Sequence, residues 1–229
     1  YASKKGIDFI ICDHHRPGDE IPKAKAVLDP KRDDCDYPFK ELCGCGVGFK
    51  LIQALASKKG ETIDDLVLHL DLVATAIGAD IVPIIGENRI LAYHGLKVIN
   101  QNPRPGFKAI IKQVKKEILT ITDVVFIIAP RINAAGRMKH GNHAVTLLSE
   151  TDSDLAAQYA NEIDTYNTDR RDTDKRITIE ALNQIEENKE QEGYTTVVYN
   201  ENWHKGVIGI VASRLIETYY RPTVVLTES

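Results

Sequence analysis

The sequence predicts an α/β fold: a mostly parallel sheet with flanking helices, then a long connecting helix, then the start of a second, smaller α/β domain. Two patterns lead to this prediction. Up to about Leu148, short apolar runs alternate with segments of helical period, which is typical of a parallel sheet covered by helices. From Asp152 to about Asn188 there is neither Gly nor Pro, and apolar residues recur at helical spacing.

In the first region, residues 1–150, the elements follow one another in order. Residues 1–6 end in a glycine and predict the tail of a helix closed by a Gly cap. The apolar run over residues 8–12 predicts a buried strand. Helices are predicted over 47–58, 63–77, 87–100 and from about 105 onward, with shorter helical pieces after 120–123 and 142–145.

The other two regions are the connecting helix, residues 151–192, and the beginning of a further domain, residues 193–229. β-branched residues predict a strand over 195–199. A turn at 203–206 leads into a helix over 207–219, and a second strand follows at 223–226. The order strand, helix, strand predicts a βαβ unit.

The tripeptide Asp13-His14-His15 directly follows the first strand. Ligands bind outside the carboxyl ends of the strands in an open α/β sheet, so a carboxylate and two imidazoles at this place suit a divalent metal. Adjacent His residues alternate faces on an extended segment, and a purely structural role for the tripeptide stays open. Asp80 follows another apolar stretch and precedes Pro83, so it can face the same crevice.

The composition is that of an ordinary globular chain. Its 229 residues, 43% hydrophobic and 27% charged, are enough to bury a sizeable core. No apolar run of about 18 residues is present, so we expect no membrane-spanning helix, no membrane partner and a cytoplasmic location. The net charge of −4 does not indicate nucleic-acid binding, so basic groups have to be sought locally.

The four cysteines invite a zinc interpretation, but their spacing does not favour it. Cys43 and Cys45 are separated by one residue, whereas paired zinc ligands have two to four residues between them. We expect both to be small packing residues in a Gly-rich turn before the helix over 47–58, with reduced thiols.

Five blocks of sequence, in order along nearly the whole chain, carry a family resemblance. They are residues 10–15, 44–51, 78–83 with 86–89, 129–138, and 203–214. They resemble the DHH phosphoesterase superfamily and, within it, the RecJ family of single-strand-specific DNA exonucleases. The segment Pro-Arg-Ile-Asn-Ala-Ala-Gly-Arg at 130–137 points to RecJ more narrowly than Asp-His-His does.

The resemblance implies a phosphodiesterase that uses two manganese or magnesium ions. It implies that His14 and Asp80 bind metal, that His15 lies beside the scissile phosphate, and that Asp13 orients an imidazole. Residues 1–150 would be the C-terminal part of a DHH domain and residues 193–229 the N-terminal part of a DHHA1-type domain. The family has aspartate-rich metal motifs upstream of Asp-His-His and a glycine- and histidine-containing motif further on. Neither is in this sequence, so we expect an internal fragment with an incomplete two-metal site, inactive alone.

Four residues are candidates for contact with nucleic-acid phosphates. Arg131, Asn133 and Arg137 lie in a segment that we expect to form a loop, in which Gly136 allows a tight turn. The structural alternative is that one of the arginines braces this loop against a carboxylate. His204 precedes the last helix and is placed to meet a phosphate there, or to cap the turn.

Two further charged groups have weaker claims. Arg104, Lys108, Lys112, Lys115 and Lys116 share neighbouring helical turns and are best interpreted as a solvated helix face. The polar middle of the long helix, residues 169–176, is also expected to face solvent. The alternative there is that Arg170 or Arg171 contacts substrate phosphates.

We therefore expect an enzyme that removes nucleotides from single-stranded DNA, from the 5′ end by family resemblance, in DNA repair and recombination. A helicase or a single-strand-binding protein would be a further partner. Two alternatives stay open: a DHH-type phosphodiesterase acting on nucleotides or short oligoribonucleotides, and a catalytically inactive relative that binds single strands.

Overall fold

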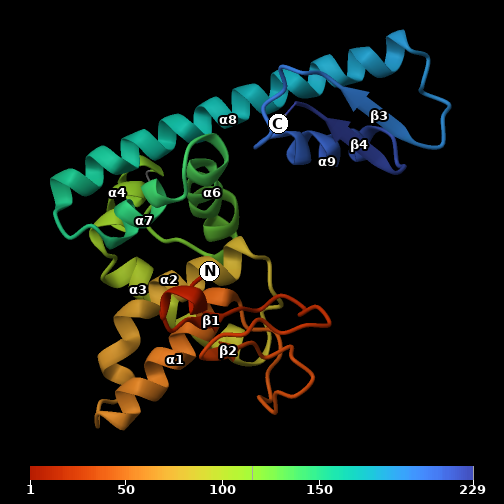
Figure 1. The fold of residues 1–229 in the computed structure, drawn as a ribbon. Helices are drawn as coiled ribbons and strands as arrows, with labels where there is room; N and C mark the ends of the chain where they lie inside the picture. The colour runs from red at the N-terminus through yellow and green to blue at the C-terminus, as the bar shows by residue number, and fades with distance from the viewer. Residues whose placement is uncertain (115, 229) are drawn as a thin grey trace. The chain divides into compact units, whose positions relative to one another are not determined.

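The computed structural model describes residues 1–114 and 116–228 (Figure 1). The chain forms two compact units, Tyr1–Pro130 and Arg131–Ser229, and each is described by itself. The predicted α/β class is confirmed, because each unit contains a two-stranded parallel sheet with helices packed around it. Among the described residues, no helix is long and apolar enough to cross a membrane.

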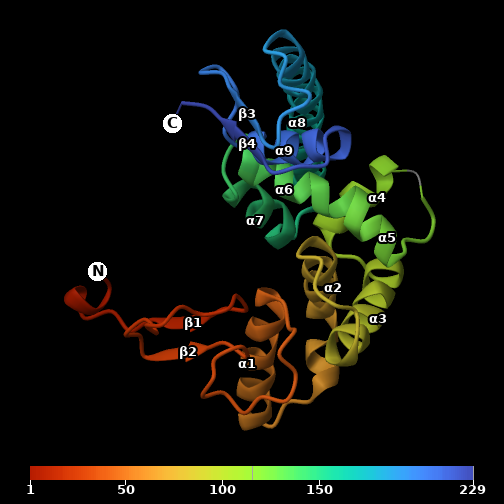
Figure 2. The ribbon, with the colours of Figure 1, turned by 90° about the vertical axis from the view of Figure 1, so that its right-hand side faces the viewer.

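The first unit begins with a small parallel sheet. A single 3-10 turn, η1 (Ser3–Lys5), ends at Gly6 with φ of 69°, which confirms the predicted Gly cap. Strand β1 (Ile10–Cys12) pairs in parallel with β2 (Ala26–Leu28), and Figure 2 shows the two strands side by side next to helix α1. The sequence did not predict β2, because three residues are too few to display a period.

Helices make up the rest of the first unit. The predicted helix over 63–77 is only partly right, because its first residues form a 3-10 helix. A capping box between Thr62 and Asp65 stabilises the start of this 3-10 helix. Phe49, Leu66 and Ile77 belong to the core that joins α1 to the helices after it. The elements are α1 (Gly44–Lys58), η2 (Ile63–His69), α2 (Leu70–Ala79), α3 (Gly86–Gln101), α4 (Pro105–Val114), α5 (Ile121–Asp123) and the π-helical η3 (Val124–Ile128).

The expectation of a loop over 131–138 is wrong, because this segment is helix α6 (Ala129–Met138). α6 continues directly from the π-helical η3, so Pro130 lies inside a continuous helical run and removes one backbone hydrogen bond just after the π-helical turn. Ala134 and Ala135 are fully buried on its inner face. Gly136 costs such a helix only about 1 kcal/mol, which this burial readily offsets.

The second unit is built along one long helix. Helix α8 (Ser153–Glu187) confirms the predicted connecting helix, and Asp152 caps it by accepting from the N–H groups of Asp154 and Leu155. Helix α7 (Asn142–Ser149) packs against α8, as do β3 (Thr196–Tyr199) and α9 (Ile208–Thr218). The last strand, β4 (Thr223–Leu226), pairs in parallel with β3.

The core of this βαβ unit joins α8, β3 and α9. Ile177, Ile185, Val198, Trp203 and Leu215 are all buried in it. The predicted strands and helix between 195 and 226 are therefore confirmed to within a residue or two. The predicted domain boundaries after residues 150 and 192 remain predictions. The two compact units of the chain meet at Pro130, which is a different position.

Candidate metal and phosphate sites

Asp13 organises the turn that ends strand β1. Its backbone N–H still donates to Leu28 O at 2.9 Å, so the residue is the last to pair with the neighbouring strand. Its Oδ1 then accepts the N–H groups of His14 and His15 at 2.7 and 3.2 Å. The same oxygen lies 2.7 Å from His15 Nδ1. The carboxylate thus folds the chain back and holds one imidazole.

The protonation state of this group follows from its partners. The bond with the His15 ring, followed by the two backbone N–H bonds, lowers the pKa of Asp13 to about 2. Asp13 is therefore a carboxylate at every pH near neutral, and a carboxylate can only accept. His15 Nδ1 must then carry the proton in this bond, which leaves Nε2 as the outward-facing nitrogen of a largely exposed ring.

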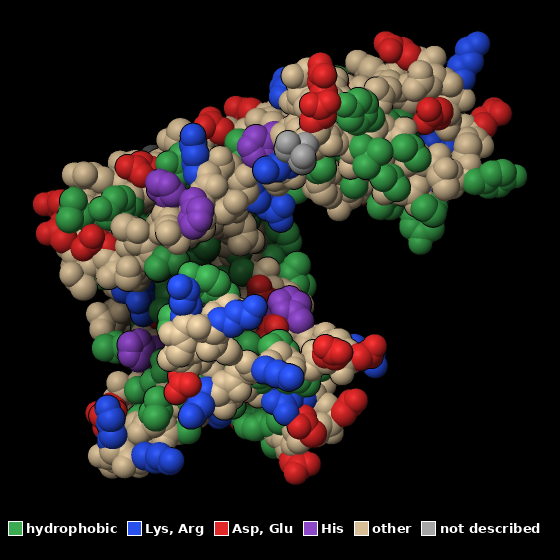
Figure 3. Space-filling model, in the orientation of Figure 1, with side chains coloured by type: hydrophobic (Ala, Val, Ile, Leu, Met, Phe, Trp, Pro, Cys, Tyr) green, Lys and Arg blue, Asp and Glu red, His purple; other side chains and the backbone are tan. Residues whose placement is uncertain are grey.

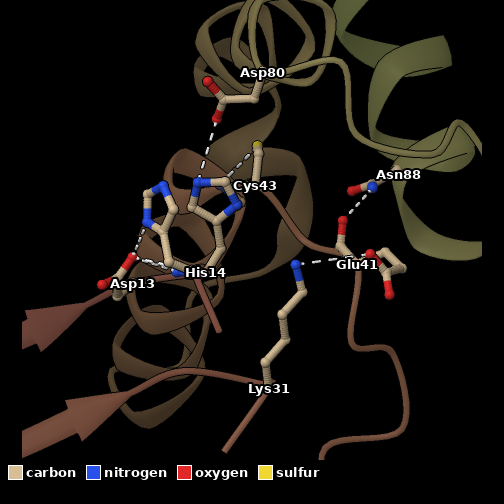
Figure 4. A network of polar contacts seen from close by, with 9 residues as sticks. Asp13, His14, Lys31, Glu41, Cys43, Asp80 and Asn88 are labelled. Carbon is tan, nitrogen blue, oxygen red and sulfur yellow. Dashed lines mark hydrogen bonds and ion pairs between the residues drawn. The ribbon is translucent and has the colours of Figure 1, made fainter. Parts of the chain in front are cut away.

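His14 points the other way, toward the end of α2. Its Nε2 lies 3.7 Å from Oδ2 of Asp80, the residue that caps α2 (Figure 4). Its side chain is 17% exposed and packs against Gly44, where an added Cβ would come within 3.3 Å of the ring. Within the described residues, His14 Nδ1 is buried and has no hydrogen-bond partner. A nitrogen and an oxygen donor therefore face each other across a short gap.

These two donors suit a divalent cation but do not complete its coordination. Among the described residues, no group of three or more His, Cys, Asp or Glu side chains is arranged to hold a metal ion. His14 and Asp80 supply one imidazole and one carboxylate, a set compatible with manganese or magnesium once further oxygen ligands are added.

Cys43 lies beside this pair and has a structural role. It is fully buried and is the N-cap of α1, with its Sγ accepting from the N–H of Gly46 at 3.3 Å. Burial raises the pKa of its thiol, so it stays protonated. This agrees with the expected packing role of Cys43 in the turn before the helix.

Asn88 braces the turn that carries Asp80, a role that sequence reasoning missed. Its side chain is fully buried, and its Nδ2 donates to Glu41 O at 2.6 Å and to Pro83 O at 3.0 Å (Figure 4). It therefore ties the backbone after Asp80 to the backbone before Cys43. The only available signal was its place in the block 86–89, and a block without a local period does not show which of its members is buried.

The predicted phosphate contacts lie in the second unit, and the structure brings two of them together. Arg137 on α6 donates from Nη1 to Gly206 O at 3.2 Å, and His204 Nδ1 accepts from the N–H of Gly206 at 3.1 Å. An added Cβ on Gly206 would lie 2.2 Å from Arg137 O, so only glycine fits this approach. On the drawn face of this unit, Lys, Arg and His side chains gather together (Figure 3).

Arg131 and Asn133 are placed differently. Arg131 Nε donates to Asp164 Oδ1 on α8 at 3.0 Å, which is the bracing contact named above as the alternative to phosphate binding. Asn133 is exposed on α6. Of the four predicted residues, the structure thus joins Arg137 to the turn of His204, pairs Arg131 with a carboxylate, and leaves Asn133 facing solvent.

Two members of the basic group around α4 form ion pairs within the first unit. Arg104 makes a two-pronged contact with the buried carboxylate of Asp71, at 2.6 and 2.8 Å. Lys116 contacts Asp123 at 2.5 Å. Lys108 and Lys112 are exposed, and Lys115 lies outside the described residues. The expected solvated helix face is thus found for Lys108 and Lys112, whereas Arg104 and Lys116 lie outside α4 and pair with carboxylates.

Comparison with known proteins places these features in a family. The model of the "DHH family, N-terminal domain" matches residues 1–77, which include the Asp13 turn, His14 and the helix leading to Asp80. The chain is thus similar to proteins of the DHH family. Over 98% of its length it is 43% identical to the single-stranded-DNA-specific exonuclease RecJ of Bacillus subtilis and 36% identical to that of Escherichia coli.

Solved structures agree with this assignment. A crystal structure of exonuclease RecJ bound to manganese matches 99% of the chain with a TM-score of 0.87 at 31% identity, covering 56% of that protein. RecJ from Thermus thermophilus in complex with Mn²⁺ matches 98% with a TM-score of 0.86 at 30% identity, covering 33% of that protein. The chain spans 28% of the Bacillus relative and 41% of the Escherichia relative.

Proposed function

We propose that the protein is a metal-dependent phosphodiesterase that removes nucleotides from single-stranded DNA. The observation that carries this proposal is the pairing of His14 with Asp80 at the end of β1, in a chain similar over nearly its whole length to single-strand-specific exonucleases. The remaining metal ligands would come from parts of the protein outside residues 1–229.

His14 and Asp80 would hold one side of a two-metal site. Two divalent ions about 4 Å apart neutralise a phosphodiester and generate hydroxide near neutral pH. The short gap between His14 Nε2 and Asp80 Oδ2 supports this assignment, as does the buried position of the His14 ring. Manganese or magnesium is proposed because oxygen ligands would dominate such a cage.

His15 would act on the substrate and not on the metal. With Nδ1 held by the Asp13 carboxylate, the ring presents Nε2 to solvent. In its protonated form, His15 would donate from Nε2 to a phosphate oxygen or to the leaving oxygen. Asp13, a carboxylate at neutral pH, would keep the ring in this orientation and stabilise its positive charge.

Arg131, Asn133, Arg137 and His204 would hold the DNA backbone in the second unit. Arg137 and His204 share the turn at Gly206, which supports a joint contact. Contacts of this kind read phosphates and not bases, so selectivity for single strands would rest on backbone tracking and stacking. Arg131 would mainly stabilise the fold through its hydrogen bond to Asp164, and contact with DNA would be an additional role.

The family resemblance supplies the wider proposal. Digestion would run from the 5′ end, in DNA repair and recombination and in the cytoplasm. A helicase or a single-strand-binding protein is the proposed further partner.

The decisive experiment uses the full-length protein with labelled single-stranded and blunt duplex DNA in the presence of manganese. We expect rapid loss of the single strand and little loss of the duplex. Manganese affinity, followed by electron paramagnetic resonance, should fall at least tenfold in Asp80→Asn and in His14→Ala. Asp64→Asn, an exposed carboxylate of the same unit, is the matched control. Equal digestion of duplex, or unchanged manganese affinity in both site variants, would overturn the proposal.

A further inference from the structure

The guanidinium of Arg170 on α8 has too few partners for its degree of burial. Its Nη2 donates to Asn167 Oδ1 at 3.0 Å. Within the described residues, its Nε is buried and has no hydrogen-bond partner. A guanidinium carries five N–H donors, and burying a charged group without an opposite charge is costly. The side chain is therefore held in place while part of its hydrogen-bonding capacity is unused, as expected for a residue that binds a ligand.

The nearby carboxylate of Asp174 is hydrogen-bonded to another arginine. Asp174 lies one turn further along α8 and is fully buried. Both of its oxygens accept from Arg214 on α9, at 2.8 and 2.7 Å. The neutral amide of Asn167, itself buried, orients Arg170 but adds no charge. Arg170 is thus oriented by a neutral amide, and the one carboxylate that acts on it, Asp174, is hydrogen-bonded to Arg214.

More positive than negative charge surrounds this group. Burial lowers the pKa of Arg170, and the nearby charges of Arg171, Arg137 and Arg214 lower it further, against Asp174. Glu217 acts on Arg214 as well. Among the charged groups that act on Arg170, three guanidinium groups stand against the single carboxylate of Asp174. An anion is the ligand that this excess favours.

We propose that Arg170, oriented by Asn167, binds a backbone phosphate of single-stranded DNA, with Arg137 as a second cationic contact. The guanidinium charge is delocalised over its three nitrogens, so a phosphate at the accessible part of the half-buried side chain neutralises the charge of the whole group. Arg171 is exposed and contributes long-range attraction only. This inference rests on the proposed function, since it adds a phosphate contact to the same substrate.

The test measures DNA affinity of the full-length protein, with calcium in place of manganese so that the strand is not cut. Arg170→Gln is expected to weaken binding of a single-stranded oligonucleotide by about tenfold. Each phosphate contact on a single strand contributes about 0.7 to the slope of log affinity against log salt, so that slope should fall by about this amount. Arg170→Lys keeps the charge and should recover part of the affinity.

Arg176→Gln is the matched control, because Arg176 lies on the same helix and pairs with Glu180 on an exposed face. It should leave affinity and salt slope unchanged. If Arg170→Gln behaves like Arg176→Gln while the parent still binds and digests single strands, the inference fails and the proposed function stands. If the parent does not bind single-stranded DNA, both the inference and the proposed function fail.

Inorganic phosphate added at constant ionic strength tests whether DNA occupies this guanidinium. It should weaken DNA binding by the parent more than by Arg170→Gln, because only the parent has the contact for which phosphate and DNA compete. If Arg170 held free phosphate and not the DNA backbone, Arg170→Gln would bind DNA as tightly as the parent, and this result would overturn the backbone assignment. The melting temperature of Arg170→Gln shows whether a loss of affinity comes from a loss of stability. Asn167→Leu is a second variant, which keeps Arg170 but removes the hydrogen bond that orients its side chain. It should also reduce the slope of log affinity against log salt.

Discussion

Gly95 on α3 marks a close approach to α2, and replacing it by alanine should move the end of α2 that carries the proposed metal ligand Asp80. An added Cβ would lie 2.1 Å from Leu70 O and 2.5 Å from the Cβ of Ala74, both on α2. Contact between carbon atoms is favourable only from about 3.5 Å, so the helices must separate by roughly 1 Å. Because α2 ends at Asp80, this separation also shifts a proposed metal ligand.

The expected magnitude is a balance of two terms. Overpacking of this size costs about 3 kcal/mol. Alanine is the better helix former by about 1 kcal/mol, which offsets part of that cost. Gly95→Ala should therefore lower the free energy of unfolding by about 2 kcal/mol, a fraction of total stability large enough to measure easily.

Urea unfolding followed by circular dichroism at 222 nm measures the effect, with the slope m checked for change. Gly48→Ala is the matched control, because Gly48 lies inside α1 and an added Cβ meets no atom within 4 Å. The control should be more stable than the parent by up to about 1 kcal/mol. If Gly95→Ala is as stable as the parent while Gly48→Ala gains stability, the close packing of α2 on α3 is refuted.

Two further replacements test ion pairs. Contact with Lys116 lowers the pKa of Asp123 to about 2, so its stabilisation is complete above its ordinary pKa near 4 and disappears as pH falls to about 2. Asp123→Asn should cost about 1 kcal/mol at pH 7 and nothing at pH 2 in thermal unfolding, and a pH-independent cost would contradict this. Arg214→Gln leaves the buried carboxylate of Asp174 without an opposite charge and should lower the free energy of unfolding by about 3–5 kcal/mol. The double variant Asp174→Leu with Arg214→Met removes both charges and should recover most of this loss. Equal urea midpoints for the single and double variants would count against this account.

The elements that could be predicted are those whose signals are local. Helix α8 lacks Gly and Pro over its whole length, and Asp152 at its start is a strong N-cap. Asp-His-His directly follows strand β1, as the sequence predicted, and Asp80 faces His14. The chemical roles of these residues remain predictions.

The misses come from contacts between residues far apart in the sequence. Arg131 on α6 pairs with Asp164 on α8, 33 residues further along the chain, and no local pattern near either residue predicts this pair. For α6 itself, Pro130 and Gly136 are turn-forming residues elsewhere, and burial of the two alanines between them decides for a helix. A rule based on composition gives the wrong answer where tertiary packing outweighs propensity.

The backbone beside Asp80 explains why Asn88 is buried next to the candidate site. Ile81 has φ of 53°, a left-handed conformation that is costly for a β-branched residue, and its side chain is 80% exposed, so packing does not compensate it. Such strain costs about 1–3 kcal/mol and persists only where neighbours over-determine the conformation. The two hydrogen bonds from Asn88, to Pro83 O and Glu41 O, supply that constraint from within the core. The carboxylate of Asp80 is therefore held toward His14 by a strained turn and a buried amide, and not by its own helix alone.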